Sequence, residues 1–98
     1  MTSFHAKRIE EEIKKEVSKI VSQELGDPRI GFVTISRVSL NRDLRLAHIF
    51  ITVFNQTDKT TTLIILNRAK KHIRWILAQR MRFRRVPDIN FQMEDDRS

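Results

Sequence analysis

The apolar residues at the start of the chain recur every three or four positions between Phe4 and Leu25. An α-helix makes about 3.6 residues per turn, so this spacing places them on one helical face. They are Ile9, Ile13, Val17, Ile20, Val21 and Leu25. Gly26 follows the last of them, as in helices that end with a left-handed residue, and Pro28 disfavours any continuation. The pattern therefore predicts a helix over residues 4–25.

The next two apolar segments largely alternate with polar residues instead. Residues 32–40 and 45–54 are rich in β-branched and aromatic side chains, which is typical of strands. Asn41, Arg42 and Asp43 separate them, and Asn and Asp favour turns because their side chains bond to nearby backbone groups. Because so short a connection joins antiparallel neighbours, we expect these strands to pair in that way.

Residues 60–82 contain β-branched residues that would also suit a strand, but their apolar spacing favours a helix. The positions at helical spacing are Leu66, Ala69, Ile73, Ile76 and Leu77. A polar break over residues 55–58 precedes this helix, and Pro87 ends it. Residues 88–93 alternate again and predict a last strand. The order helix, strand, strand, helix, strand predicts an α+β fold in which helices pack on one three-stranded sheet.

Composition limits the classes of protein that this chain can represent. A length of 98 residues with 40% apolar residues suits a single domain with one core. No apolar run approaches the roughly 20 residues that a membrane span needs, so we expect no span. We expect no membrane partner either, although the net positive charge would also suit an anionic membrane surface, if less well than nucleic acid. The chain has no cysteine, and its two glycines cannot form a P-loop or a dinucleotide fingerprint.

Catalytic and metal-binding patterns are absent from the sequence. His5, His48 and His72 fall in three different predicted elements without metal-ligand spacing. No nucleophile motif surrounds any serine or threonine. We therefore expect no metal, no cofactor and no enzymatic activity, and we interpret the chain as a binding protein.

The charge is strongly positive and unevenly distributed. The net charge is +7, and residues 59–85 contain nine basic residues and no acidic one. The first predicted helix instead mixes both signs, as solvated helix faces do. An unrelieved positive segment is favoured where it meets phosphates and releases their counterions. The candidate RNA-binding residues are Arg68, Lys70, Lys71, Arg74, Arg80, Arg82, Arg84 and Arg85. Of these, Arg80 falls near the apolar stripe of its helix, where its stem would pack.

Trp75 lies about opposite the apolar stripe of the 60–82 helix. A tryptophan among basic residues is suited to stacking on a base or to packing against a protein partner. Burial against a neighbouring element of the same domain is the alternative, since tryptophan is usually at least partly buried.

The chain resembles bacterial ribosome-binding factor A over nearly its whole length. The most specific segment is Asp27-Pro28-Arg29-Ile30-Gly31-Phe32-Val33-Thr34-Ile35. Further matching segments keep the same order and spacing, among them residues 8–17, 66–69, 73–74 and 84–91. Since no single fragment is decisive, the resemblance rests on the whole series.

The resemblance implies a KH-like fold of the second type, with a kinked second helix. We expect one KH-like domain over residues 1–94 and a polar tail over residues 95–98. In place of the usual GxxG loop, the family carries an Ala-x-Gly kink, to which Ala69, Lys70 and Lys71 correspond. Lys71 replaces the glycine. We still expect a bend here, because a kink whose backbone stays right-handed accepts other residues.

The function implied by the resemblance is that of a ribosome-binding factor. Members assist late maturation of the small (30S) ribosomal subunit, bind its 16S rRNA and support processing of the rRNA 5′ end. They are linked to growth in the cold, and a ribosome-assembly GTPase takes part in their release. We accordingly expect a cytoplasmic monomer. Two alternatives from the charge pattern stay open: a general single-stranded RNA-binding protein and a basic protein-interaction module.

Overall fold

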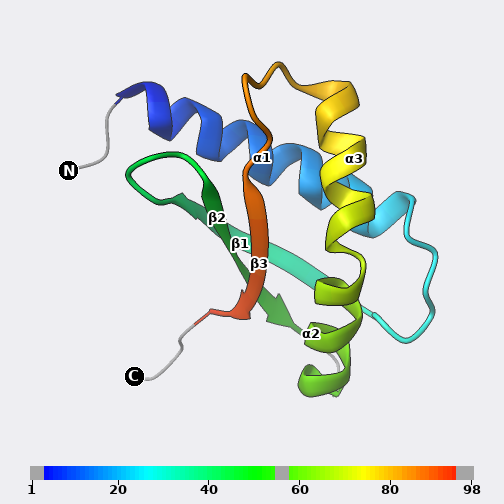
Figure 1. The fold of residues 1–98 in the computed structure, drawn as a ribbon. Helices are drawn as coiled ribbons and strands as arrows, with labels where there is room; N and C mark the ends of the chain where they lie inside the picture. Colours follow the sequence, from blue (N-terminus) through cyan, green and yellow to red (C-terminus); the bar gives the residue numbers. More distant parts are fainter. Residues whose placement is uncertain (1–3, 55–57, 95–98) are drawn as a thin grey trace.

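The computed structural model describes residues 4–54 and 58–94, which form three helices and three strands (Figure 1). The helices are α1 (Phe4–Gln23), α2 (Lys59–Arg68) and α3 (Lys70–Arg80), and the strands are β1 (Val33–Leu40), β2 (Leu46–Val53) and β3 (Asp88–Met93). The order α1-β1-β2-α2-α3-β3 confirms the predicted α+β class and the kinked second helix. The predicted tail, residues 95–98, lies outside the described residues.

The three strands form one sheet in the order β1-β2-β3. β1 and β2 are antiparallel neighbours, as predicted from their short connection. β3 lies parallel to β2, with Ala47 beside Ile89 and Ile49 beside Phe91. A parallel neighbour needs a crossover connection, and α2 together with α3 forms it. The two helices are thereby held against the sheet, and their connection to β3 runs along one end of the molecule.

A β-bulge interrupts β1 between Ile35 and Arg37. Simple alternation would place Ile35 and Arg37 on the same face of the sheet. The extra residue, Ser36, shifts the register so that Ile35 and Val38 are both buried, although they are three positions apart. The bulge therefore keeps two apolar residues in the core that a regular strand would send to opposite faces.

The core lies between one face of the sheet and the helices. α1 packs against β1 and contacts α3, while α2 packs beside β3 (Figure 1). Residues that are almost inaccessible to solvent come from each of these elements and include Ile13, Ile20, Ile49, Leu66, Ile73, Leu77, Ile89 and Phe91. Burial of Ile89 and Phe91 in a strand confirms the interpretation of the segment after Pro87. The second face of the sheet carries polar contacts, such as the hydrogen bond between the Ser36 and Thr52 hydroxyls.

Two helices end slightly earlier than predicted. α1 ends at Gln23 instead of Leu25, and the backbone N–H of Leu25 bonds to the carbonyl of Ile20 as the chain turns. Gly26 has a φ of 64°, the left-handed conformation expected of a residue that ends a helix. α3 ends at Arg80, so Arg82 lies in the connection to β3.

The side chain of Asn67 fastens α2 to the outer edge of β3. Its amide nitrogen donates to the Phe91 carbonyl at 3.1 Å, and the Phe91 N–H donates to its amide oxygen at 3.0 Å. β3 is an edge strand, so these two backbone groups have no strand partner on that side. Asn67 pairs with both in the way that a neighbouring strand would.

Candidate nucleic-acid interface

The junction between α2 and α3 is a one-residue break at Ala69. Ala69 has φ −86° and ψ 0°, and its N–H is shared between the carbonyls of Ile65 and Leu66, both at 3.1 Å. The helical bond pattern resumes when the Ile73 N–H donates to the Ala69 carbonyl at 3.0 Å. The backbone therefore bends without a left-handed residue. The predicted bend is confirmed, and Lys71 in place of glycine is accommodated because it lies within regular α3.

Three of the candidate cations surround this break. Arg68 ends α2, while Lys70 and Lys71 begin α3, and all three side chains are exposed. Among the described residues, none of the three takes part in an ion pair. Their charges are therefore available to a partner.

A second group of candidate cations lies on the connection between α3 and β3. Arg82, Arg84 and Arg85 are exposed and line a groove of about 460 Å³. The groove is closed on its other sides by the first half of α1 and by the turn between β1 and β2. Arg45, on that turn, also lines the groove, but its Nε lies 3.8 Å from Asp43 Oδ2, and both Asp43 and Glu12 are among the lining residues. No local signal in the sequence reveals Arg45 as a lining residue, because only the fold brings this turn beside residues 82–85.

Arg74 has a structural role, because two of its nitrogens donate hydrogen bonds to backbone carbonyls. Its Nε donates to the Pro87 carbonyl at 2.9 Å, and its Nη2 donates to the Val86 carbonyl at 3.0 Å. Its Nη1 also lies 3.5 Å from a carboxylate oxygen of Asp88. Arg74 thus ties α3 to the chain that enters β3, and it holds the arginine-rich connection in place.

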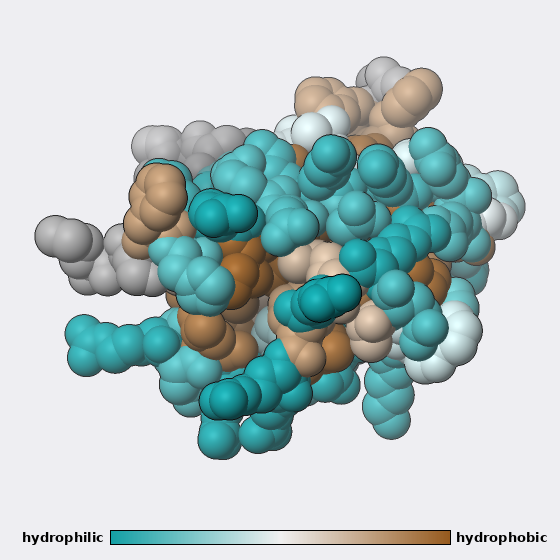
Figure 2. Space-filling model, turned by 90° about the horizontal axis from the view of Figure 1, so that it is seen from above, coloured by the Kyte–Doolittle hydropathy of each residue, from teal (hydrophilic) through white to brown (hydrophobic). Residues whose placement is uncertain are grey.

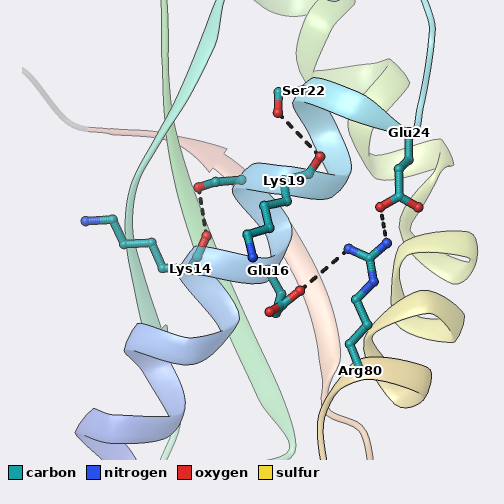
Figure 3. A network of polar contacts seen from close by, with 7 residues as sticks. Lys14, Glu16, Lys19, Ser22, Glu24 and Arg80 are labelled. Carbon is teal, nitrogen blue, oxygen red and sulfur yellow. Dashed lines mark hydrogen bonds and ion pairs between the residues drawn. The ribbon is translucent and has the colours of Figure 1, made fainter.

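Arg80 reaches from α3 to two carboxylates, one within α1 and one just after its last residue (Figure 3). Its Nη1 lies 3.5 Å from Glu16 Oε1, and its Nη2 donates to Glu24 Oε2. The pKa of Arg80 is raised above its usual value, mainly by the hydrogen bond to Glu24. The positive charge of Arg80 is therefore largely balanced within the fold, and the expected packing role of its stem agrees with a side chain that is only 33% exposed.

The eight candidates thus fall into two kinds. Arg74 and Arg80 hold parts of the fold together. The other six are exposed and form no ion pair within the described part of the chain: Arg68, Lys70, Lys71, Arg82, Arg84 and Arg85. Figure 2 looks from above onto the end of the molecule where α1 and the 81–87 connection lie, and hydrophilic side chains cover most of it. Such an arrangement of free cations suits a polyanion.

Trp75 is exposed over 63% of its surface, which decides between the alternatives left by the sequence. It does not fold inward against a neighbouring element. Its ring lies beside that of His72, one turn earlier on α3, so both aromatic side chains belong to the same outer surface of the helix.

Other kinds of site have little support in the described part of the chain. There, no group of three His, Asp or Glu side chains is placed to hold a metal ion. None of the helices in residues 4–54 and 58–94 is both long enough and apolar enough to cross a bilayer. What the described surface offers is binding through charge, through the exposed His72–Trp75 pair and through three further exposed rings, those of Phe4, Phe32 and Phe54.

Comparison with known proteins supports the same interpretation. A sequence model described as ribosome-binding factor A matches residues 5–98. Ribosome-binding factor A of Brevibacillus brevis is 35% identical over 96 residues, which cover 97% of this chain and 79% of the relative. The crystal structure of the Thermus thermophilus factor superposes with a TM-score of 0.80 at 28% identity, covering 88% of this chain and 92% of that one.

A second Thermus thermophilus structure adds a partner for that relative. It is a homology model of ribosome binding factor A fitted into the cryo-electron-microscopy map of a complex with the 30S subunit. It superposes with a TM-score of 0.76 at 28% identity and covers 89% of this chain and 92% of its own. The sequence match over nearly the whole length and the shared fold agree: the chain belongs to the ribosome-binding factor A family.

Proposed function

We propose that this protein binds the small ribosomal subunit through its 16S rRNA and assists late maturation of that subunit. Membership of the ribosome-binding factor A family is the observation that carries the proposal. A relative with the same fold has been fitted into a map of a 30S complex, which supports the same partner for this chain.

The surface chemistry supports RNA as the component that is bound. Six exposed basic residues lie around the helix break and along the connection to β3, within a segment that contains no acidic residue. Structured RNA presents phosphates at regular spacing, and its helices are recognised mainly through shape and backbone contacts. Each phosphate that a lysine or arginine neutralises releases a counterion and favours binding.

The finer parts of the proposal follow from the family resemblance. The protein acts as a cytoplasmic monomer, supports processing of the 16S rRNA 5′ end without cleaving RNA itself, and leaves the particle with the help of a ribosome-assembly GTPase. A last part rests on the charge pattern and the contacts described above: the phosphate contacts come from Arg68, Lys70, Lys71, Arg82, Arg84 and Arg85, whereas Arg74 and Arg80 keep this surface in shape.

Neutralising the two lysines at the start of α3 tests the proposal. Lys70→Gln with Lys71→Gln should weaken co-sedimentation with immature small subunits and reduce the salt slope of binding by about two, one for each phosphate contact. The matched control is Lys14→Gln with Lys15→Gln, a second tandem lysine pair, located among mixed charges on α1. Circular dichroism should show both double variants to be folded.

The outcomes separate the proposal from its alternatives. Equal losses in both double variants would indicate a diffuse charge effect, and no loss at Lys70 and Lys71 would contradict the assigned surface. Binding to any naked single-stranded RNA as tightly as to immature subunits would favour the general RNA-binding protein. In cells, the Lys70–Lys71 variant should accumulate 16S rRNA with an unprocessed 5′ end, and the Lys14–Lys15 variant should not.

A further inference from the structure

Trp75 lies on the outer surface of α3, where most of its apolar ring is left in water. Its neighbours Ile73, Ile76 and Leu77 are buried, whereas 63% of the Trp75 surface is exposed. A large aromatic ring left in water forgoes the stabilisation that burial would provide. The position therefore suits a contact that forms when a partner binds.

His72 gives this ring a companion with the same orientation. The two ring centroids are 6.4 Å apart and the ring planes differ by only 9°. The distance lies within the usual range for interacting aromatic pairs. Because the pair comes from residues three apart on a regular helix, its geometry exists before any partner arrives. Binding of a flat ligand on the indole would therefore cost little entropy for ordering these two side chains.

The charge around the pair indicates which flat ligand this is. Lys71 precedes Trp75 by one helical turn and is exposed, and the exposed Arg68 lies beyond it across the break at Ala69. The whole segment 59–85 contains no acidic residue. A nucleotide combines a flat aromatic base with a negative phosphate, so it complements both features, whereas an apolar protein surface complements only the ring.

We propose that Trp75, together with His72, forms a stacking platform for one unpaired base of the bound RNA, while Lys71 and Arg68 contact phosphates beside it. The base must be unpaired, because bases in a duplex cover each other's faces and only loops, bulges and ends present them to a protein. This inference rests on the proposed function and deepens it, since it adds an unpaired nucleotide to the backbone contacts of structured RNA.

The composition of the chain provides a direct measurement. Trp75 is the single tryptophan and the chain has no tyrosine, so intrinsic tryptophan fluorescence reports on this position alone. We expect single-stranded oligoadenylate to quench the fluorescence of the full chain on binding. A blunt RNA duplex of the same length should bind through its phosphates and leave the fluorescence nearly unchanged.

Substitution of the ring supplies the second measurement. Loss of one base–aromatic stack should weaken binding of oligoadenylate to Trp75→Ala by roughly 5- to 150-fold, with Trp75→Phe in between. The salt slope should not change, because stacking releases no counterions. Phe4→Ala is the matched control: Phe4 is 83% exposed on α1, outside the basic segment, and its loss should leave the affinity unchanged.

Three results would overturn the inference. They are the absence of quenching by oligoadenylate, equal quenching by the duplex, and wild-type affinity in Trp75→Ala. If Trp75→Ala weakens binding to assembled subunits but not to oligoadenylate or naked 16S rRNA, the ring contacts a ribosomal protein instead. The proposed function fails separately: it requires the Lys70–Lys71 neutralisation to weaken subunit binding, whatever Trp75 does.

Discussion

Replacing Thr62 by valine should make the protein more stable. Thr62 lies in the first turn of α2 and is completely buried, yet its hydroxyl oxygen has no hydrogen-bond partner. Its backbone N–H bonds normally to the Asp58 carbonyl at 3.0 Å, so only the hydroxyl is unsatisfied. Valine has the same shape with a methyl group in place of that hydroxyl, and it would fill the same space without a polar atom.

The expected gain follows from the energetics of buried hydroxyls. Leaving such a group without a partner costs roughly 1–3 kcal/mol in proteins. Threonine and valine have similar helix propensities, so the exchange adds little cost from the backbone. We therefore expect Thr62→Val to raise the free energy of unfolding by about 1 kcal/mol or more. For a domain of this size, each such increment raises Tm by roughly 4–8 °C.

Thermal unfolding followed by circular dichroism measures the effect, and Thr61→Val is the matched control. The Thr61 hydroxyl donates to the Asp58 carboxylate at 2.8 Å, and this bond is the main cause that lowers the pKa of Asp58. Removing it should lower Tm at neutral pH. A Thr62→Val protein that unfolds at or below the wild-type temperature would refute the reasoning, because it would mean that the hydroxyl is satisfied in solution.

Two further perturbations test contacts elsewhere in the fold. Asn67→Ala leaves the Phe91 N–H and carbonyl unpaired at the edge of β3. Urea unfolding should therefore show a free energy of unfolding lower by about 1–3 kcal/mol, and the Phe91 amide hydrogen should exchange faster with solvent. Unchanged exchange would contradict the pairing. Asp27 accepts from the Nε and the backbone N–H of Arg29 at 3.0 and 2.9 Å, and the side-chain bond is the main cause that lowers its pKa from 3.8 to about 2. Because the pKa of Asp27 is lower in the folded than in the unfolded state, its ionised form stabilises the fold at pH values above the unfolded pKa. This stabilisation is lost as the pH falls from about 4 towards 2. Asp27→Asn should therefore have a lower Tm than wild type at pH 7, and the difference should shrink over that interval; a constant difference would speak against the ion pair.

The ends of the helices and strands could be predicted from the sequence to within about two residues, because each element buries one apolar face. The stripe on α1 and the alternation in β2 are local consequences of helical and extended geometry. The break at Ala69 was expected from the family resemblance, since the apolar spacing continues through it without a signal. The bulge at Ser36 was not expected, because it depends on how β1 meets β2 and on which residues the core can accept.

The candidate interface was predictable as a segment but not residue by residue. The sequence shows a run of basic residues without acidic ones, but it does not show that two of these residues, Arg74 and Arg80, bind to groups within the fold. Arg80 meets Glu24, which lies 56 positions away, and Arg74 meets the Pro87 carbonyl, 13 positions away. Arg45, on the turn between β1 and β2, lines the same groove as Arg82, which lies on the connection between α3 and β3. Contacts over such separations depend on the path of the chain.

By itself, the sequence determined which side chains must leave water and where positive charge accumulates, because both depend on residue type and local periodicity. Only the tertiary structure decided that β3 joins β2 in parallel, that Asn67 covers the edge of this strand, and that Trp75 stays exposed. The physical reason is the same in each case. Hydrophobic burial is non-directional, so the apolar face of a single helix or strand can be recognised from its sequence alone. Hydrogen bonds and ion pairs require specific distances and angles, so they depend on which residues the fold brings together, and so does the absence of a neighbour over Trp75.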